Sequence, residues 1–191
     1  MKNLILLLPI FIVFNSCAQK HSSTPPILPI DATTHRITFR DTVSATVISK
    51  DILCTRLKKW FIDNSATENT TLQSSGRDSG VFIGKGKFTK HCIIKDPNGT
   101  EHPIDFRVTY SVKILVKNNA SYITLEDFIG TAGEEDHIGA EITSMYKAIK
   151  YYQAKKMNEQ DKQVSQSLID VLEETKIKAT EILASIKRAV N

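Results

Sequence analysis

The sequence predicts an α+β fold, in which one helix packs on a curved antiparallel sheet and a helical extension follows at the C-terminus. Alternating apolar and polar residues predict a strand at 37–43, and apolar residues at three-to-four spacing then predict a helix at 49–66. Alternation returns in about four consecutive segments before residue 131. Because consecutive antiparallel strands form a meander with one apolar face, this order places the helix on that face.

The predicted helix begins at capping residues and carries one apolar stripe. Ser49 is placed to accept a hydrogen bond from the first turn, and Asp51 lies where the helix dipole favours a carboxylate. The stripe consists of Leu53, Leu57, Trp60 and Phe61. We therefore expect Trp60 to be a core residue at the place where the helix meets the sheet.

Recognisable turns separate the strands that follow. A turn at 75–79 precedes a long strand that is expected to carry the apolar residues Val81, Ile83, Phe88, Cys92 and Ile94. The next turn, at 96–99, has the sequence Asp-Pro-Asn-Gly, which a type I turn prefers. Asn118 and Asn119 then reverse the chain between the strand at 104–117 and a last strand. The strand at 104–117 has one apolar face, made of Phe106, Val108, Tyr110, Val112, Ile114 and Val116.

The C-terminal third carries two helical stripes separated by a polar break at 158–163. The first stripe is Ile138, Ile142, Met145, Ile149 and Tyr152, and the second is Val164, Leu168, Leu172, Ala179, Ile182, Ile186 and Val190. Two arrangements fit this pattern. Either the helices pack back on the domain, or a long helix projects from it and associates with another chain, which includes self-association as a homo-oligomer.

Several of these residues together resemble a known bacterial family. Trp60, the segment RDSGVFIGKG at 77–86 and the hairpin at 108–128 resemble a domain of unknown function with a TATA-binding-protein-like (TBP-like) fold. The resemblance covers about residues 36–130, which leaves 131–191 as a C-terminal helical region. It implies the fold and an envelope location, because the family occurs mainly in small envelope proteins with N-terminal signals. It implies no catalytic residue, and here Ile123 follows Tyr122 where the family commonly has a basic residue.

The N-terminus predicts a lipid anchor. Lys2 precedes an apolar run from Leu4 to Phe14, which is shorter than the roughly 20 residues that a membrane-spanning helix needs. Asn15-Ser16-Cys17 follows, similar to the processing site of bacterial lipoproteins, with Cys17 as the lipidated residue. The alternative is a simple secretory signal with a chance cysteine. We therefore expect a signal at 1–17 and a flexible tether at 18–35, with the protein in the outer membrane and facing the periplasm.

The other two cysteines have two interpretations. In an oxidising compartment, Cys54 and Cys92 are an even pair that a disulfide would join. Cys54 also lies on the apolar face of the predicted helix, where a free thiol packs well. The second interpretation is the favoured one.

Motifs for chemistry are weak in this chain. Gly80, Gly84 and Gly86 resemble a phosphate loop, but no helix follows them, so bends or bulges in a strand are the simpler explanation. The segment at 133–137, which ends in His137, reads as an acidic loop before a helix rather than as a metal site. His91 and His102 flank a turn without the spacing of a catalytic or metal site. No catalytic, cofactor or metal residue is predicted.

The function predicted from these observations is that of a lipid-anchored binding protein of the bacterial cell envelope. Its partners are expected to be the membrane, through Cys17, and an envelope protein or glycan, through the sheet face or the C-terminal helix. The alternative is an envelope hydrolase acting on glycan or peptide, with a site that no local motif reveals. Nucleic acid is excluded as a partner, because a formal net charge of +4 is small and a lipidated protein has no access to DNA.

Overall fold

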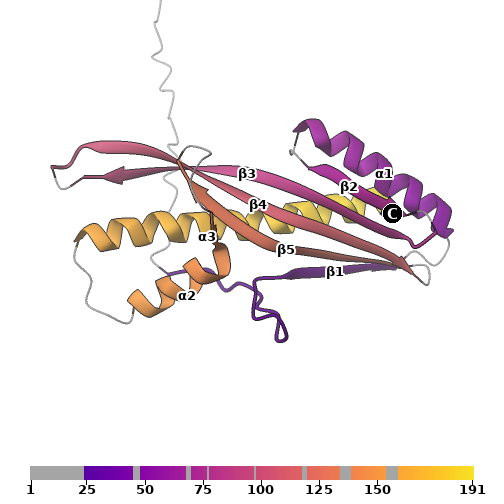
Figure 1. The fold of residues 1–191 in the computed structure, drawn as a ribbon, viewed down its shortest axis with the longest axis horizontal. Coiled ribbons are helices and arrows are strands. Elements are labelled where there is room, and N and C mark those ends of the chain that lie inside the picture. The colour runs from indigo at the N-terminus through magenta and orange to yellow at the C-terminus, as the bar shows by residue number, and fades with distance from the viewer. Residues whose placement is uncertain are drawn as a thin grey trace, which may run out of the picture.

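The computed structural model shows a long, twisted antiparallel sheet with helices packed against it (Figure 1). It describes residues 24–44, 48–67, 70–76, 78–96, 98–117, 120–133, 139–153 and 159–191. The predicted signal and Cys17 lie outside these residues, as do Asn118, Asn119 and His137.

The order of elements confirms the predicted fold. Along the described chain they are β1 (Phe39–Ser44), α1 (Lys50–Thr67), β2 (Thr71–Gly76), β3 (Val81–Lys95), β4 (Glu101–Lys117), β5 (Ala120–Ala132), β6 (Ala140–Glu141), α2 (Ile142–Gln153) and α3 (Glu159–Val190). The strands pair in the order β1-β5-β4-β3-β2, and the short β6 pairs with β5. All of these pairings are antiparallel, so β2 to β5 form the expected meander and β1 closes on its last strand.

Helix α1 forms as its sequence predicts. Ser49 Oγ accepts a hydrogen bond from the Ile52 amide across 3.4 Å, which caps the first turn. The expected stripe is buried and consists of Leu53, Leu57, Trp60 and Phe61. Trp60 is a core residue, and its indole nitrogen donates a hydrogen bond to Ser185 Oγ on α3, so it lies where α1 meets α3 as well as the sheet.

The buried face of β3 differs from the prediction in its first half. Val81 and Ile83 point away from the helices, and Ile83 is exposed, whereas Phe82 is fully buried. Next along the buried face come Gly84 and Gly86, where an added Cβ would collide with the Phe61 ring and the Tyr110 ring respectively. These glycines therefore make room for aromatic side chains and do not form a phosphate loop. The predicted strand irregularity lies opposite Gly84, where the register of β2 on β3 shifts between Leu72 and Ser74. A search for apolar periodicity misses this face because aromatic rings from other elements occupy it.

Strand β4 has the predicted alternation throughout. Its buried face is Phe106, Val108, Tyr110, Val112, Ile114 and Val116. The turn between β3 and β4 also forms, with the Gly99 amide bonded to the Asp96 carbonyl across 2.9 Å and Gly99 at a φ of 84°. The pairing of β4 with β5 is interrupted once, where the register shifts between Thr109 and Ser111.

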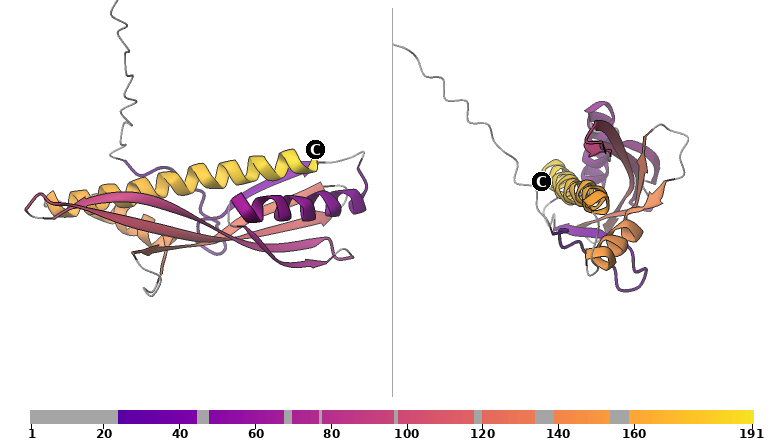
Figure 2. Two further views of the ribbon diagram at one scale, coloured as in Figure 1. Left: turned by 90° about the horizontal axis from the view of Figure 1, so that it is seen from above. Right: turned by 90° about the vertical axis from the view of Figure 1, so that its left-hand side faces the viewer.

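The C-terminal region forms two helices that pack on the domain (Figure 2). Helix α3 contacts β1, β3 and β5 and lies on the same side of the sheet as α1. It buries Ile169, Val171, Leu172, Ala179, Ile182, Ile186 and Val190. The predicted break at 158–163 is misplaced, because α3 already begins at Glu159. Val164, which was expected in the buried stripe, is 41% exposed.

Cys54 and Cys92 are buried and are not joined in a disulfide. Burial is the main cause that raises the pKa of the Cys92 thiol, so this side chain behaves as a small apolar residue. The structure thus supports the packing interpretation of these cysteines over the disulfide.

The N-terminal segment joins the domain before β1 begins. Leu28 is buried, and the Thr38 amide donates to the Pro29 carbonyl across 3.0 Å. Asp31 Oδ1 accepts hydrogen bonds from the Thr33 and Thr34 amides and closes a turn there. The expected tether is therefore packed against the domain from Leu28 onward. None of the described helices has the length and apolar character to cross a membrane.

Candidate functional site

The helices leave one face of the sheet uncovered, and we call this face the open face. In Figure 1 it is turned toward the viewer, with α3 passing behind β4 and β5. Side chains on the open face alternate with the buried ones, so Lys85 pairs with Ser111 and Lys87 pairs with Thr109 across β3 and β4. The open face also carries Ile83, Arg107, Lys113, Thr124, Glu126 and Ile129. It is therefore largely polar, in contrast to the apolar face beneath the helices.

A shallow groove of about 470 Å³ lies on the open face, and we call it the open-face groove. Five separate segments build it: the loop before β1, the middle of β3, the middle of β4, the second half of β5, and β6 with the residue before it. Its lining includes Arg36, Lys85, Thr109, Ser111, Asp127, Ile129, Gly139 and Glu141. A hollow lined by both charge signs and two hydroxyls is suited to holding a ligand with polar groups.

The groove forms where the pairing of β4 and β5 is interrupted. Thr109 pairs with Ile129, but Ser111 pairs with Glu126, so β5 has an extra residue at this point. Within it, Asp127 has a φ of 55°, a left-handed conformation that is uncommon for a residue other than glycine. A bulge bends the strand and redirects a side chain. Here it directs the Asp127 carboxylate to the rim of the groove, toward Arg36.

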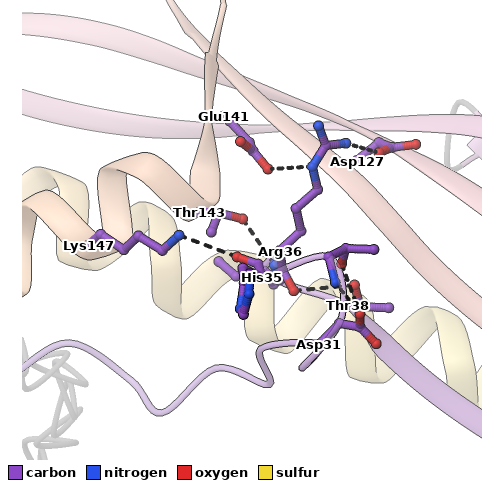
Figure 3. Close-up of polar contacts among 10 residues, drawn as sticks. Asp31, His35, Arg36, Thr38, Asp127, Glu141, Thr143 and Lys147 are labelled. Carbon is purple, nitrogen blue, oxygen red and sulfur yellow. Dashed lines mark hydrogen bonds and ion pairs between the residues drawn. The ribbon is translucent and has the colours of Figure 1, made fainter.

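Arg36 joins the two carboxylates of the groove (Figure 3). Its Nη1 lies 3.0 Å from Asp127 Oδ1, and its Nε lies 3.3 Å from Glu141 Oε1. The Arg36 side chain remains 54% exposed, so solvent screens these ion pairs and each contributes little to stability. Their structural effect is to fix one wall of the groove with a cation between two anions.

The loop that carries Arg36 is held by two hydrogen bonds from α2. The Ile37 amide donates to Thr143 Oγ1 across 2.9 Å, and Lys147 Nζ donates to the His35 carbonyl across 3.4 Å (Figure 3). Both partners belong to α2, so this helix positions the loop. His35 itself has a φ of 56°, which turns the chain sharply just before Arg36.

Asp31 anchors the start of the same loop. Its carboxylate accepts the two turn amides and also binds Arg40 Nη1 across 2.6 Å. The Thr34 amide, followed by the Arg40 guanidinium, holds the pKa of the Asp31 carboxyl well below its usual range. The loop therefore keeps this negative charge, and with it the Arg40 contact, throughout the physiological pH range.

The opposite wall of the groove is cationic. Lys85 lines it, Lys87 follows on the same face of β3, and Lys113 lies diagonally across on β4. All three side chains are exposed, and within the described residues none of them forms an ion pair. Unlike Arg36, these amines are available to a ligand.

His91 and His102 lie away from the groove. His91 Nδ1 lies 2.6 Å from Asp105 Oδ1, and His102 Nε2 lies 3.3 Å from Asp96 Oδ2, both pairs toward the β3–β4 hairpin end. His91 and His102 are exposed, and neither lines the open-face groove. Across the described residues, no group of three or more His, Cys, Asp or Glu side chains is placed to hold a metal ion.

A second hollow, of about 740 Å³, lies along the outer side of α3. Pro26 of the N-terminal segment forms one wall, and the helix contributes Lys176, Ile177, Thr180 and Ala184 among others. Ile177 is 50% exposed there. This surface is less polar than the open-face groove.

Sequence reasoning did not identify the groove residues as a site. They come from positions between 36 and 141 that meet only after the meander folds and the bulge forms. The signal that was present is local: Lys85 and Lys87 in β3, and Thr109, Ser111 and Lys113 in β4, occupy the polar positions of strands whose other face is buried.

Comparison with known proteins confirms the fold and the resemblance. Residues 39–129 match the family described as a domain of unknown function, DUF4468, with TBP-like fold. A DUF4468 family protein from Bacteroides ovatus is similar in structure, with 12% identity, a TM-score of 0.53 and coverage of 83% of this chain and 90% of that one. A TBP-like protein from Parabacteroides distasonis has 11% identity, a TM-score of 0.53 and coverage of 85% and 96%. At these identities the likeness concerns the fold alone, and no curated protein matches this chain.

Proposed function

From the fold of this family and the uncovered sheet face, we propose that the chain is a lipid-anchored binding protein of the bacterial cell envelope, which binds its partner on the open face. The observation that carries the proposal is the asymmetry of the sheet. The described helices all pack on one side, and the other side presents a groove lined by both charge signs, beside amines that form no ion pair with a described residue. Loops and surfaces held by a rigid sheet are where folded domains commonly place binding residues.

The chemistry of the groove favours binding over hydrolysis. A hydrolase needs a nucleophile or an acid–base pair directed at the substrate. In the groove, Asp127 and Glu141 are instead joined to the same guanidinium, that of Arg36, and together they hold a loop in place. The hydrolase alternative therefore lacks a supporting observation at this site.

The anchor is the second part of the proposal. The apolar run ending at Ser16-Cys17 supports lipidation of Cys17, and the packed segment from Leu28 supports a short connection between the lipid and the domain. Extended chain spans about 3.3 Å per residue, so the residues between Cys17 and Leu28 would reach roughly 35 Å. That length allows the open face to contact another envelope component close to the membrane.

Site-specific crosslinking in intact cells tests the binding face. A photoreactive residue is placed at Thr109 in the groove, and in matched control proteins at Lys58 on α1 or Lys176 on α3. All three positions are exposed. We expect a defined adduct from position 109 and none from the two helical positions. Adducts formed mainly from the helices would mean that the open face is not the binding surface.

Detergent phase partitioning tests the anchor. The Cys17→Ala variant is expected to move from the detergent phase to the aqueous phase, because it lacks the residue that carries the lipid. The wild-type N-terminus is expected to carry an acyl mass beginning at Cys17. A wild-type protein without that mass would show that the segment is a simple secretory signal.

A further inference from the structure

We propose that the ligand of the open face is an acidic polysaccharide, whose anionic groups contact Lys85, Lys87 and Lys113 and whose hydroxyls hydrogen-bond in the open-face groove. This inference rests on the binding function proposed above and adds the chemical class of the ligand.

The positions of the three lysines indicate a ligand with repeated negative charges. Lys85 and Lys87 are two positions apart on one face of β3, so their Cα atoms are separated by about 6–7 Å. Lys113 lies on the neighbouring strand, opposite Ile83, and strands in a sheet are spaced about 4.8 Å apart. Three exposed amines thus form a compact cluster, with no ion pair to described residues. Such a cluster attracts a chain of repeated negative charges more strongly than a single anion.

The groove beside the lysines indicates a ligand that also carries hydroxyl groups. Thr109 and Ser111 place two hydroxyls between the cationic wall and the acidic wall, and no hydrogen bond of either side chain to a described residue is observed. A hydroxyl both donates and accepts, whereas the carboxylates of Asp127 and Glu141 only accept. A ligand that satisfies both walls must offer anions to the lysines and O–H donors to the carboxylates. Sugar acids carry both kinds of group on every residue.

The groups that line the groove also distinguish a polysaccharide from other anionic ligands. An acidic peptide offers carboxylates, but it carries a hydroxyl only where a Ser, Thr or Tyr side chain occurs and not on every residue. An anionic lipid surface would contact the lysines together with an apolar patch. On the open face the apolar positions Val81, Ile83, Leu115 and Tyr122 lie side by side next to Lys85 and Lys113, but away from the carboxylates and hydroxyls of the groove. A lipid surface on that patch would therefore leave the groove hydroxyls without partners. The mixture of charges and hydroxyls therefore favours a polysaccharide.

The test measures binding of the full chain, kept in detergent, to fluorescent polygalacturonate in the absence of divalent cations. Neutral dextran and poly-glutamate serve as comparison probes. We expect polygalacturonate to bind more tightly than either, with an affinity that falls as salt is raised because the contacts are exposed. Binding of poly-glutamate at equal affinity would show that charge alone is recognised and would overturn the inference.

A charge-matched pair of variants locates the contact. Lys85→Gln/Lys113→Gln removes two amines of the cluster, and Lys58→Gln/Lys176→Gln removes two exposed amines from α1 and α3. The two proteins have the same net charge. We expect roughly a tenfold loss of polygalacturonate affinity in the first variant and little change in the second. Equal losses in both would show non-specific attraction and would overturn the inference.

A second variant tests the hydroxyls without changing charge. Thr109→Val/Ser111→Ala is expected to weaken polygalacturonate binding severalfold and to leave the weaker poly-glutamate binding unchanged, because poly-glutamate has no hydroxyls that lose their partners. Unchanged polygalacturonate affinity in this variant would remove the groove from the contact. If crosslinking from position 109 succeeds while polygalacturonate does not bind, the binding function stands and the polysaccharide inference fails.

Discussion

Trp60 Nε1 donates a hydrogen bond to Ser185 Oγ across 2.9 Å and so joins the end of α1 to the last turns of α3. The indole is 3% exposed and packs edge-on against Phe61, with the ring centroids 4.8 Å apart. Nearby, Arg56 Nη1 donates to the Val190 carbonyl across 2.8 Å, at the end of α3. The two helices are therefore attached to one another as well as to the sheet.

Comparing substitutions at Trp60 and at Ser185 separates the contribution of packing from that of the hydrogen bond. Trp60→Ala is expected to lower the free energy of unfolding by about 3–5 kcal/mol, because it empties a large buried volume. Ser185→Ala removes only the hydrogen-bond acceptor and is expected to cost about 1 kcal/mol. Denaturant unfolding followed by circular dichroism measures both. A Trp60→Ala protein as stable as the wild type would contradict the burial of this side chain.

The glycines of β3 provide a second stability prediction. Gly84→Ala and Gly86→Ala each place a Cβ against an aromatic ring, that of Phe61 or Tyr110, and are expected to destabilise the fold by about 1–3 kcal/mol. Lys85→Ala lies between them on the open face and is expected to change stability by less than about 0.5 kcal/mol. Thermal melts of the three variants check this contrast. Equal melting temperatures would show that the aromatic rings move aside without cost.

The contrast between β3 and β4 also explains what the sequence could predict. In β4 every buried position from Phe106 to Val116 is apolar, so alternation alone identifies the face. In β3 the corresponding positions include Gly84 and Gly86, and the aromatic rings that cover these glycines come from α1 and β4. A single sequence shows the glycine but not the side chain that covers it. The face of β3 is therefore decided by tertiary contacts.

The candidate site was even less predictable from the sequence than the buried face of β3. The turn at Asp31 has a local signature, because an aspartate that accepts amides two and three residues ahead is a common turn device. The bulge at Asp127 does not, since a left-handed aspartate is set by the mismatch in strand register rather than by its neighbours. Arg36 meets Asp127 and Glu141 only when both of these features form. The fold was predictable from periodicity, and the groove was not.

Ser121 offers a position where a substitution is expected to be harmless or stabilising. It is fully buried opposite Val43 and Val116, and its Oγ has no hydrogen-bond partner among the described residues. A buried hydroxyl without a partner costs about 1–3 kcal/mol in lost hydration. Ser121→Ala is therefore expected to keep or raise the unfolding free energy, by up to about 1 kcal/mol. A clear loss of stability in chemical denaturation would reveal a role for the hydroxyl that the fold does not show.

The ion pair between Asp41 and Lys187 predicts a dependence of stability on acid. Lys187 Nζ lies 2.7 Å from Asp41 Oδ2, and this hydrogen bond is the main cause that lowers the pKa of the Asp41 carboxyl. A carboxyl whose folded pKa lies below its unfolded value of about 3.9 stabilises the fold above that pH, and the contribution is lost as pH falls through the folded pKa. Because both side chains are partly exposed, the contribution is less than about 1 kcal/mol.

Asp41→Asn is expected to remove this part of the acid dependence. The difference in unfolding free energy between wild type and variant should be constant at neutral pH and should shrink as pH falls below about 4. Denaturant melts at several pH values measure it, with Asp63→Asn, an exposed residue paired with Lys59 on α1, as the matched control. A difference that stays constant down to pH 2 would show that Asp41 titrates in the same range in the folded and unfolded chain.

Removal of α3 tests whether it is part of the core or an appendage. Ile169, Leu172, Ala179, Ile182 and Ile186 are all nearly inaccessible in its packed face, and Cys92 of β3 lies beneath it, with its Sγ 3.8 Å from the Ser167 carbonyl. A sheet covered only by α1 and α2 would expose this apolar area, which a domain of this size cannot lose without losing its marginal stability. Deletion of residues 162–191 is therefore expected to give a protein that aggregates or melts without cooperativity. The truncated protein could instead stay soluble, with a cooperative thermal transition and an unchanged sheet signal in circular dichroism. That result would show that α3 is free to leave the domain, and sedimentation of the full chain would then show whether α3 joins two copies.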